Sequence, residues 1–161
     1  MKRIQPAQRL IAALWFSLVL IAAATLGASA AAMTVGTSQA QVKGSTETVL
    51  TDSHGMTLYY STQDGAQQAK CTGKCAKYWP PLLLSAGKPT GPDSIQSDLG
   101  VFDGADGRQV TYKGHPLYTF VHDQKPGEDK GEGVAGHWHV ATPSTKAIGS
   151  GNQGSSAQSS W

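Results

Sequence analysis

The chain lacks the motifs on which common enzymes depend. Gly-x-Ser-x-Gly, the phosphate-cradling glycine loop and His-Glu-x-x-His are all missing, which removes the usual signatures of serine hydrolases, nucleotide-binding enzymes and zinc proteases. Only 15% of the residues are charged. No nucleophile and general base stand in a recognisable arrangement, so we predict a protein that is not an enzyme.

The sequence also lacks the basic clusters that bind nucleic acid. It has 13 Lys and Arg against 11 Asp and Glu, and Lys2, Arg3 and Arg9 account for all of the excess. Without these three residues, 10 basic side chains stand among 11 acidic ones along the rest of the chain. Because DNA and RNA recognition depends on clustered cations, this composition argues against a nucleic-acid partner.

The first thirty residues are typical of an export signal. Lys2 and Arg3 precede an apolar run over residues 10–26, and Ala-Ser-Ala at 28–30 provides the small side chains that signal peptidase requires. No cysteine stands at the end of the run, since the first in the chain is Cys71, so the lipid attachment of bacterial lipoproteins is not available. We expect a signal peptide over residues 1–30, in a helix, and a secreted or periplasmic protein. An uncleaved anchor is the alternative, and it is the only membrane contact we expect.

Two stretches on either side of the expected domain are poor in residues that can be buried. Residues 31–46 are rich in Thr, Ser, Gln, Gly and Ala, and residues 144–161 are rich in Gly, Ser and Gln. Such composition is typical of segments that cannot offset the entropy lost on ordering. We therefore predict a flexible linker over residues 31–46, a folded domain over residues 47–143 and a disordered tail over residues 144–161.

The expected domain has the pattern of an antiparallel β protein. Short β-prone runs alternate with turn residues, namely Asp52-Ser53-His54-Gly55, several Asp-Gly pairs and Lys113-Gly114. The runs lie at residues 48–51, 56–61, 99–102, 108–112, 115–121 and 137–141. The first two predict a hairpin, the next three a meander, and the last a closing strand. We predict a small all-β fold, an antiparallel meander or sandwich.

One pattern occurs twice in this domain. Gly, Leu, Tyr and Asp have identical spacing in two sets, Gly55, Leu58, Tyr59, Asp64 and Gly114, Leu117, Tyr118, Asp123. Neighbouring residues on a strand face opposite sides, so each Leu and its Tyr should point into different layers. Each Asp is expected to end its strand by accepting hydrogen bonds from nearby backbone amides. The repetition predicts two related β-units, and a shared site at the two strand ends is the alternative use of the Asp pair.

Between the two copies lie Cys71-x-x-x-Cys75 and Trp79-Pro80-Pro81. Taken with the copies themselves, these residues resemble the bacterial secreted-repeat family of unknown function, the predicted lipoproteins with a Tyr-x-aromatic-x-x-Asp motif. The resemblance covers about residues 49–140 and departs at Ser61, where the motif has an aromatic residue. It implies an extracytoplasmic protein and no particular activity. The motif residues that it implies are Tyr59, Asp64, Trp79, Pro80, Tyr112, Gly114, Tyr118, Asp123 and Trp138.

The two cysteines allow two interpretations. In an exported chain, a Cys pair separated by three residues predicts a structural disulfide, with Gly73 easing the turn between them. Reduced thiolates would instead select Cu(I) or support redox chemistry. The favoured interpretation is the Cys71–Cys75 disulfide.

Five histidines supply the other candidate ligands. His137 and His139 are two residues apart on an expected strand and would face the same side, with His115 or His122 as a third ligand for copper or zinc. The same pattern also fits an ordinary solvent-facing strand.

We predict a non-enzymatic extracytoplasmic binding or envelope-associated module of unknown ligand or protein partner, without a cofactor. The alternative is a copper-handling or thiol-redox protein.

Overall fold

The computed structural model describes residues 33–149, so the expected signal peptide and residues 150–161 of the expected tail lie outside the described residues. Antiparallel strands dominate this part of the chain, which confirms the predicted all-β class. Its other elements are one short helix, α1 (Asp93–Gln96), and two 3-10 turns, η1 (Cys75–Lys77) and η2 (Val134–Gly136). Across residues 33–149, no helix has the length and apolar character needed to cross a membrane.

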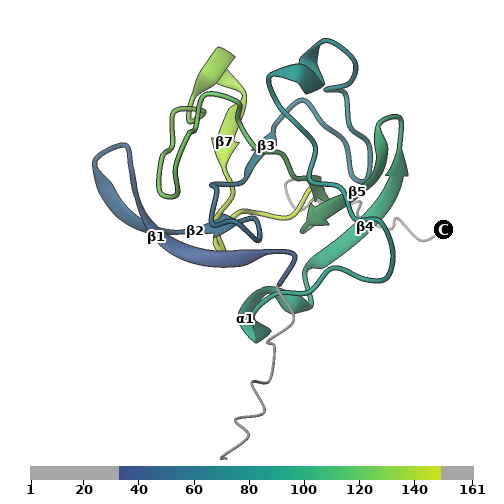
Figure 1. Ribbon diagram of the computed structural model, residues 1–161, viewed down its shortest axis with the longest axis horizontal. Helices are drawn as coiled ribbons and strands as arrows, with labels where there is room; N and C mark the ends of the chain where they lie inside the picture. Colours follow the sequence, from purple (N-terminus) through teal and green to yellow (C-terminus); the bar gives the residue numbers. More distant parts are fainter. Residues whose placement is uncertain (1–32, 150–161) are drawn as a thin grey trace, which may run out of the picture. The chain divides into compact units, whose positions relative to one another are not determined.

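The strands form three small antiparallel sheets (Figure 1). They are β1 (Gly36–Val42) with β2 (Ser45–Thr51), β3 (Tyr59–Ser61) with β7 (Trp138–Val140), and β4 (Leu99–Gly104), β5 (Gly107–Tyr112) and β6 (His115–Pro116) in that order. The β1–β2 and β4–β5 hairpins lie on opposite sides of the β3–β7 pair in Figure 1. The predicted meander and the predicted last strand are both confirmed.

The prediction of a flexible linker over residues 31–46 is wrong for residues 36–46. These residues form β1, the turn that follows it and the start of β2. Lys43 and Gly44 both have positive φ, 50° and 83°, and form the two-residue turn that joins these strands. Such a turn matches the twist of a hairpin. Ala40 and Val42 are buried, while Thr37, Gln39 and Gln41 at the alternate positions are exposed. A strand with one buried face needs only alternate apolar residues, so a polar composition does not exclude it.

The start of the expected tail also belongs to the fold. Thr145 is buried, and the backbone N–H of Ile148 donates to the carbonyl of Lys113 over 3.1 Å. The prediction of disorder is therefore wrong for residues 144–149. Backbone pairing with the turn that precedes β6 holds this segment, and composition alone carries no sign of such a partner.

The first predicted hairpin is present, but its second strand changes partner. Asp52 Oδ1 accepts hydrogen bonds from the amides of His54 and Met56, at 2.8 and 2.9 Å, and fixes the turn. Leu58 N–H then donates to Leu50 O over 2.9 Å. From Tyr59 onward the chain leaves β2 and pairs with β7. The returning segment therefore connects the first β-unit to the end of the second.

This exchange of partners occurs in both units. Three backbone hydrogen bonds of 2.8–2.9 Å link Leu50, Leu58 and Ala141 in a closed triangle. Three bonds of 2.8–3.0 Å link Val110, Leu117 and Leu82 in the same way. In each triangle two residues come from one unit and the third comes from the segment that ends the other. Neither unit satisfies its backbone groups alone, so the two are expected to fold together.

The side chains form two hydrophobic clusters on opposite faces of the repeated strands. Tyr59 and Tyr118 belong to the first cluster, which holds most of the aromatic rings. Leu58 and Leu117 belong to the second, which is mainly aliphatic. This confirms the expectation that the paired Leu and Tyr face different layers, and it places the motif tyrosines beside Trp79 and Trp138.

Candidate functional site

The motif tyrosines and aspartates are joined across the two units. The Tyr59 hydroxyl donates to Asp123 Oδ2 over 2.6 Å, and the Tyr118 hydroxyl donates to Asp64 Oδ2 over 2.9 Å. The second oxygen of each carboxylate accepts from a backbone amide, Lys70 on Asp64 and Lys130 on Asp123. Each Asp therefore caps its own loop, as predicted, and also binds a tyrosine of the other unit.

Burial makes the tyrosines of these pairs poor acids. It raises the pKa of both tyrosines far above the usual value, and the neighbouring carboxylates add to the effect. Burial also raises the pKa of Asp64 and Asp123, against the opposing effect of their hydrogen-bond donors. The tyrosines therefore stay protonated at neutral pH and act as hydrogen-bond donors. The arrangement suits a structural crosslink between units.

A backbone bridge and a pair of tryptophans lie beside these crosslinks. Tyr59 and Tyr118 exchange two backbone hydrogen bonds, of 2.8 and 3.0 Å. Trp79 and Trp138 stack with ring centroids 3.8 Å apart and planes 4° apart. Tyr59 meets Trp79 edge to face, and Tyr118 meets Trp138 in the same way. All four residues repeat with an offset of 59 positions, so the two units meet in a nearly two-fold symmetric contact.

The remaining motif residues have structural partners as well. Pro80 O accepts a backbone hydrogen bond from Thr119 over 2.9 Å, and the Tyr112 hydroxyl donates to Pro143 O over 3.2 Å. Gly114 has φ of 86° in the turn before β6, a conformation that favours glycine.

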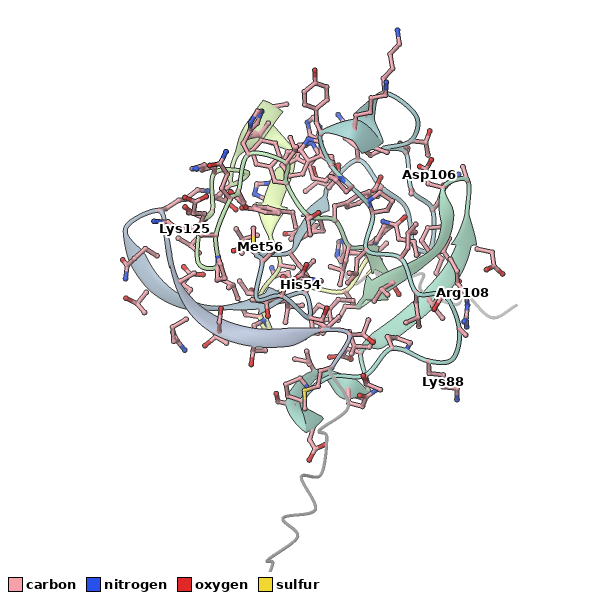
Figure 2. All side chains as sticks on the ribbon, viewed as in Figure 1. His54, Met56, Lys88, Asp106, Arg108 and Lys125 are labelled. Carbon is pink, nitrogen blue, oxygen red and sulfur yellow. A yellow bond between two sulfur atoms is a disulfide. The ribbon has the colours of Figure 1, made fainter. Side chains whose placement is uncertain are left out.

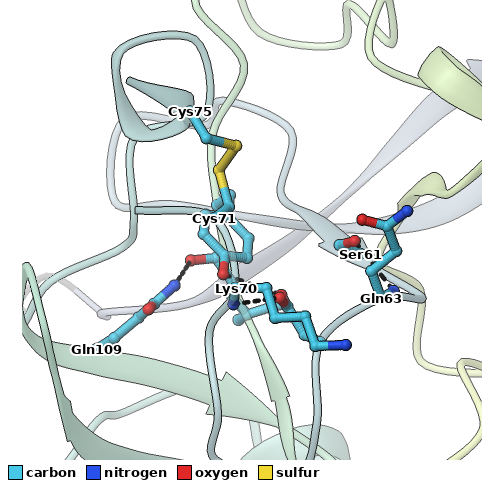
Figure 3. Close-up of a disulfide and its surroundings, with 9 residues drawn as sticks. Ser61, Gln63, Lys70, Cys71, Cys75 and Gln109 are labelled. Atoms are coloured by element: carbon cyan, nitrogen blue, oxygen red, sulfur yellow. Dashed lines mark hydrogen bonds between the residues drawn. A yellow bond between two sulfur atoms is a disulfide. The ribbon is translucent and has the colours of Figure 1, made fainter. Parts of the chain in front are cut away.

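Cys71 and Cys75 form the predicted disulfide, with Cα atoms 5.2 Å apart (Figure 3). It joins the segment that follows Lys70 to η1, the 3-10 turn that leads to Trp79. Cys71 is buried and packs with the aromatic cluster. The alternative of copper or redox chemistry needs reduced thiols, and both sulfur atoms are in the bridge here.

The structure does not bring the four candidate metal ligands together. His137 Nδ1 lies 2.9 Å from Ala135 O, while His139 Nδ1 lies 3.2 Å from Glu132 Oε1. His122 is exposed and packs edge to face with Phe120. Among residues 33–149, no group of three His, Cys, Asp or Glu side chains is placed to hold a metal ion.

The fourth candidate, His115, is buried in a different environment. Its Nε2 lies 2.8 Å from Lys146 O, and its ring packs on Tyr60 with centroids 4.5 Å apart. Its Nδ1 is buried and has no hydrogen-bond partner among the described residues. Burial lowers the pKa of His115, against the opposing influence of the Lys146 carbonyl and Asp64.

An open pocket of about 390 Å³ lies on the side of the molecule that carries the β1–β2 turn. Four segments form it: the turn and its flanks at residues 42–47, β3 through Tyr60, β7 with the loop before it, and the start of the C-terminal segment at residues 142–146. Both charge signs and several hydroxyls face it. The lining residues are Val42, Lys43, Glu47, Tyr60, Glu132, His139, Val140, Thr142, Ser144, Thr145 and Lys146.

Glu132 is the most highly coordinated side chain of this pocket. Only 8% of the side chain is exposed. Its Oε1 lies 2.7 Å from Lys43 Nζ and 3.2 Å from His139 Nδ1, and its Oε2 accepts from the Val140 amide over 2.7 Å. Burial by itself would raise the pKa of Glu132, but Lys43, the Val140 amide and His139 together hold that pKa below its usual value. The pocket therefore contains a fixed negative charge at neutral pH.

The family described as a secreted repeat of unknown function matches residues 40–83 and again residues 100–142. The chain belongs to this family. The two matches correspond to the two β-units, which confirms the resemblance seen in the sequence. Comparison with curated proteins and with solved structures gives no match.

The residues shared by the two secreted repeats differ in kind from the pocket residues. Tyr, Asp and Trp recur in both units and hold them together. With the offset of 59, the positions of Tyr60, Glu132 and His139 correspond to Thr119, Gly73 and Pro80. The pocket side chains thus occur in one unit only. These side chains are therefore not part of the pattern that the two units share.

Sequence reasoning found His139 but not Lys43, Tyr60 or Glu132. Lys43 falls in the expected linker, and Glu132 belongs to none of the motifs. The available signal was the difference between the two units: the second unit has Glu132 where the first has Gly73. That comparison becomes meaningful only when the pocket is known.

Proposed function

We propose that this secreted repeat is a non-enzymatic extracytoplasmic binding module, and that its ligand site is the pocket around Glu132. The family description and the signal-like residues 1–30 support a location outside the cytoplasm. The finer assignment to the periplasm or the cell envelope is part of the same proposal.

One observation carries this proposal. A carboxylate whose side chain is only 8% exposed keeps its charge in the lining of an open pocket, and its counterpart position in the other unit is a glycine. Keeping a buried charge costs free energy unless partners compensate for it, so a protein retains such a group where it has a use. Glu132 also satisfies one backbone group, the Val140 amide, through Oε2, while Oε1 faces the exposed ammonium of Lys43.

The motif residues support a scaffold role and argue against catalysis. Tyr59 and Tyr118 hold their protons at neutral pH and are committed to Asp123 and Asp64. The disulfide and the tryptophan stack add rigidity to the same region. A rigid scaffold with a pre-formed pocket lowers the entropy lost when a ligand binds.

Amide NMR of residues 31–161, the chain without its expected signal peptide, tests the proposal. Small polar compounds would be added class by class: amino acids and short peptides, sugars, amines and carboxylic acids. We expect at least one class to shift the amide signals of Tyr60, Glu132 and His139 in a saturable manner. Glu128, in the same loop but outside the pocket, serves as the internal control. If no class moves the pocket signals more than that of Glu128, the proposal is wrong.

A further inference from the structure

The pocket presents opposite charges on separate segments. Glu132 and Glu47 supply carboxylates, while Lys43 and Lys146 supply ammonium groups. Lys43 is already paired with Glu132, and Lys146 forms no ion pair with any described residue. Next to Lys146, the hydroxyls of Thr142, Ser144 and Thr145 lie within hydrogen-bond distance of one another or of the Thr142 amide. These groups can bind a cation at one place and an anion at another.

Lys43 shows which group Glu132 can bind. Its ammonium is 2.7 Å from Glu132 Oε1, although its side chain is 68% exposed and extends from the tip of a two-residue turn. The Lys43 side of this pair is exposed to solvent, and holding its long side chain in one place costs conformational freedom. Glu132 itself stays in place, since the Val140 amide holds its other oxygen. An external ammonium can therefore replace that of Lys43 at small cost.

We propose that the pocket binds a small zwitterion, a free amino acid or dipeptide, with its ammonium on Glu132 in place of Lys43 and its carboxylate at Lys146 and the neighbouring hydroxyls. The inference rests on the proposed function and adds the chemical class of the ligand. A volume of about 390 Å³ is near the lower end for small-molecule sites and suits a ligand of one or two residues. Tyr60 and Val140 provide apolar contact for its middle part.

A matched peptide series tests the two ends separately on residues 31–161. The dipeptide Ala-Ala has both charges, N-acetyl-Ala-Ala lacks the ammonium, and Ala-Ala-amide lacks the carboxylate. We expect Ala-Ala to bind best by amide NMR titration or calorimetry, and acetylation to weaken binding about tenfold or more, because hydrogen bonds between charged groups are strong. Equal binding of the acetylated and free peptides would overturn the inference.

Three variants and one control variant assign the charges to residues. Glu132→Gln should reduce binding of Ala-Ala about tenfold or more, whereas Glu128→Gln, which breaks the 2.9 Å pair with Lys130 outside the pocket, should leave it unchanged. Lys146→Met should weaken Ala-Ala about twofold to fivefold and leave Ala-Ala-amide unaffected. Lys43→Met should strengthen binding about twofold to fivefold, since the internal competitor is gone.

Lys43→Met keeps the inference testable even if Glu132→Gln fails to fold, because it leaves the Glu132 bond to the Val140 amide intact. Weaker binding in Lys43→Met would contradict the displacement of Lys43. If the peptides fail while sugars or other compounds shift the pocket signals, the zwitterion inference is wrong and the proposed function stands. If nothing shifts those signals, both are wrong.

Discussion

The Tyr59 hydroxyl donates a 2.6 Å hydrogen bond to Asp123, a residue 64 positions later in the chain and in the other β-unit. The matching bond from Tyr118 to Asp64 spans 54 positions. Together they tie the two units at equivalent points on either side of the Tyr59–Tyr118 backbone bridge. The repeated motif of this chain is therefore explained by the contact between its two copies.

Removing either tyrosine hydroxyl should destabilise the protein. In Tyr59→Phe, Asp123 Oδ2 loses its donor in a buried position, and we expect the free energy of unfolding to fall by about 1.5–3 kcal/mol. Tyr118→Phe should have a similar effect because its environment is nearly the same. Urea denaturation measures both. Tyr78→Phe, at a tyrosine that is 58% exposed, is the control and should change stability by less than about 0.5 kcal/mol. Equal stability of Tyr59→Phe and Tyr78→Phe would show that the crosslink is unimportant.

Gly131 should not tolerate a methyl group. A Cβ at this position would lie 2.7 Å from Tyr59 Cε1 and 2.8 Å from Trp79 Cη2, and both rings are packed in the aromatic cluster. We expect Gly131→Ala to lower the free energy of unfolding by about 1–3 kcal/mol through overpacking. The near-ultraviolet circular dichroism of the tryptophans should change with it. Thr72→Ala, at the counterpart position in the first unit, is the control and should have little effect on stability. A Gly131→Ala protein with unchanged stability and an unchanged spectrum would contradict this packing.

The disulfide should contribute modestly to stability. Its loop is short, so the chain-entropy model assigns it about 2 kcal/mol. The Cys71→Ala/Cys75→Ala variant is expected to fold with its stability reduced by that amount, as measured by thermal or urea unfolding. In the native protein both sulfur atoms should be unreactive toward thiol reagents until a reductant is added. Two readily titrated thiols in the oxidised protein would instead favour the copper or redox alternative.

His115 should make the protein less stable in mild acid. Burial lowers the pKa of His115 in the folded state below the value of 6.5 that applies to the unfolded chain. The unfolded state therefore binds a proton more readily, and stability falls as the pH drops below about 6.5. Urea unfolding at a series of pH values measures this slope. His115→Gln should reduce it, and a variant with the same slope as the parent would assign the effect to other groups.

Several features were predictable because they depend on neighbours in the sequence. The Asp52–Gly55 turn, the three-strand meander and the disulfide follow from turn residues, alternation and cysteine spacing over short distances. The repeat was visible because its residues are identical and evenly spaced. Residues 36–42 were missed because a strand with one exposed face can be composed mainly of polar residues.

The sequence by itself determined the class of fold, the presence of two related units and membership of the secreted-repeat family. The tertiary structure decided which segments pair. Leu82, at the end of the first unit, bonds to the second unit, and Ala141, at the end of the second, bonds to the first. The Tyr–Asp hydrogen bonds also join the two units. Trp79 stacks on Trp138, and Lys43 pairs with Glu132. These contacts join residues tens of positions apart, and their partners are selected by the burial and backbone pairing of the whole domain, which no local pattern specifies.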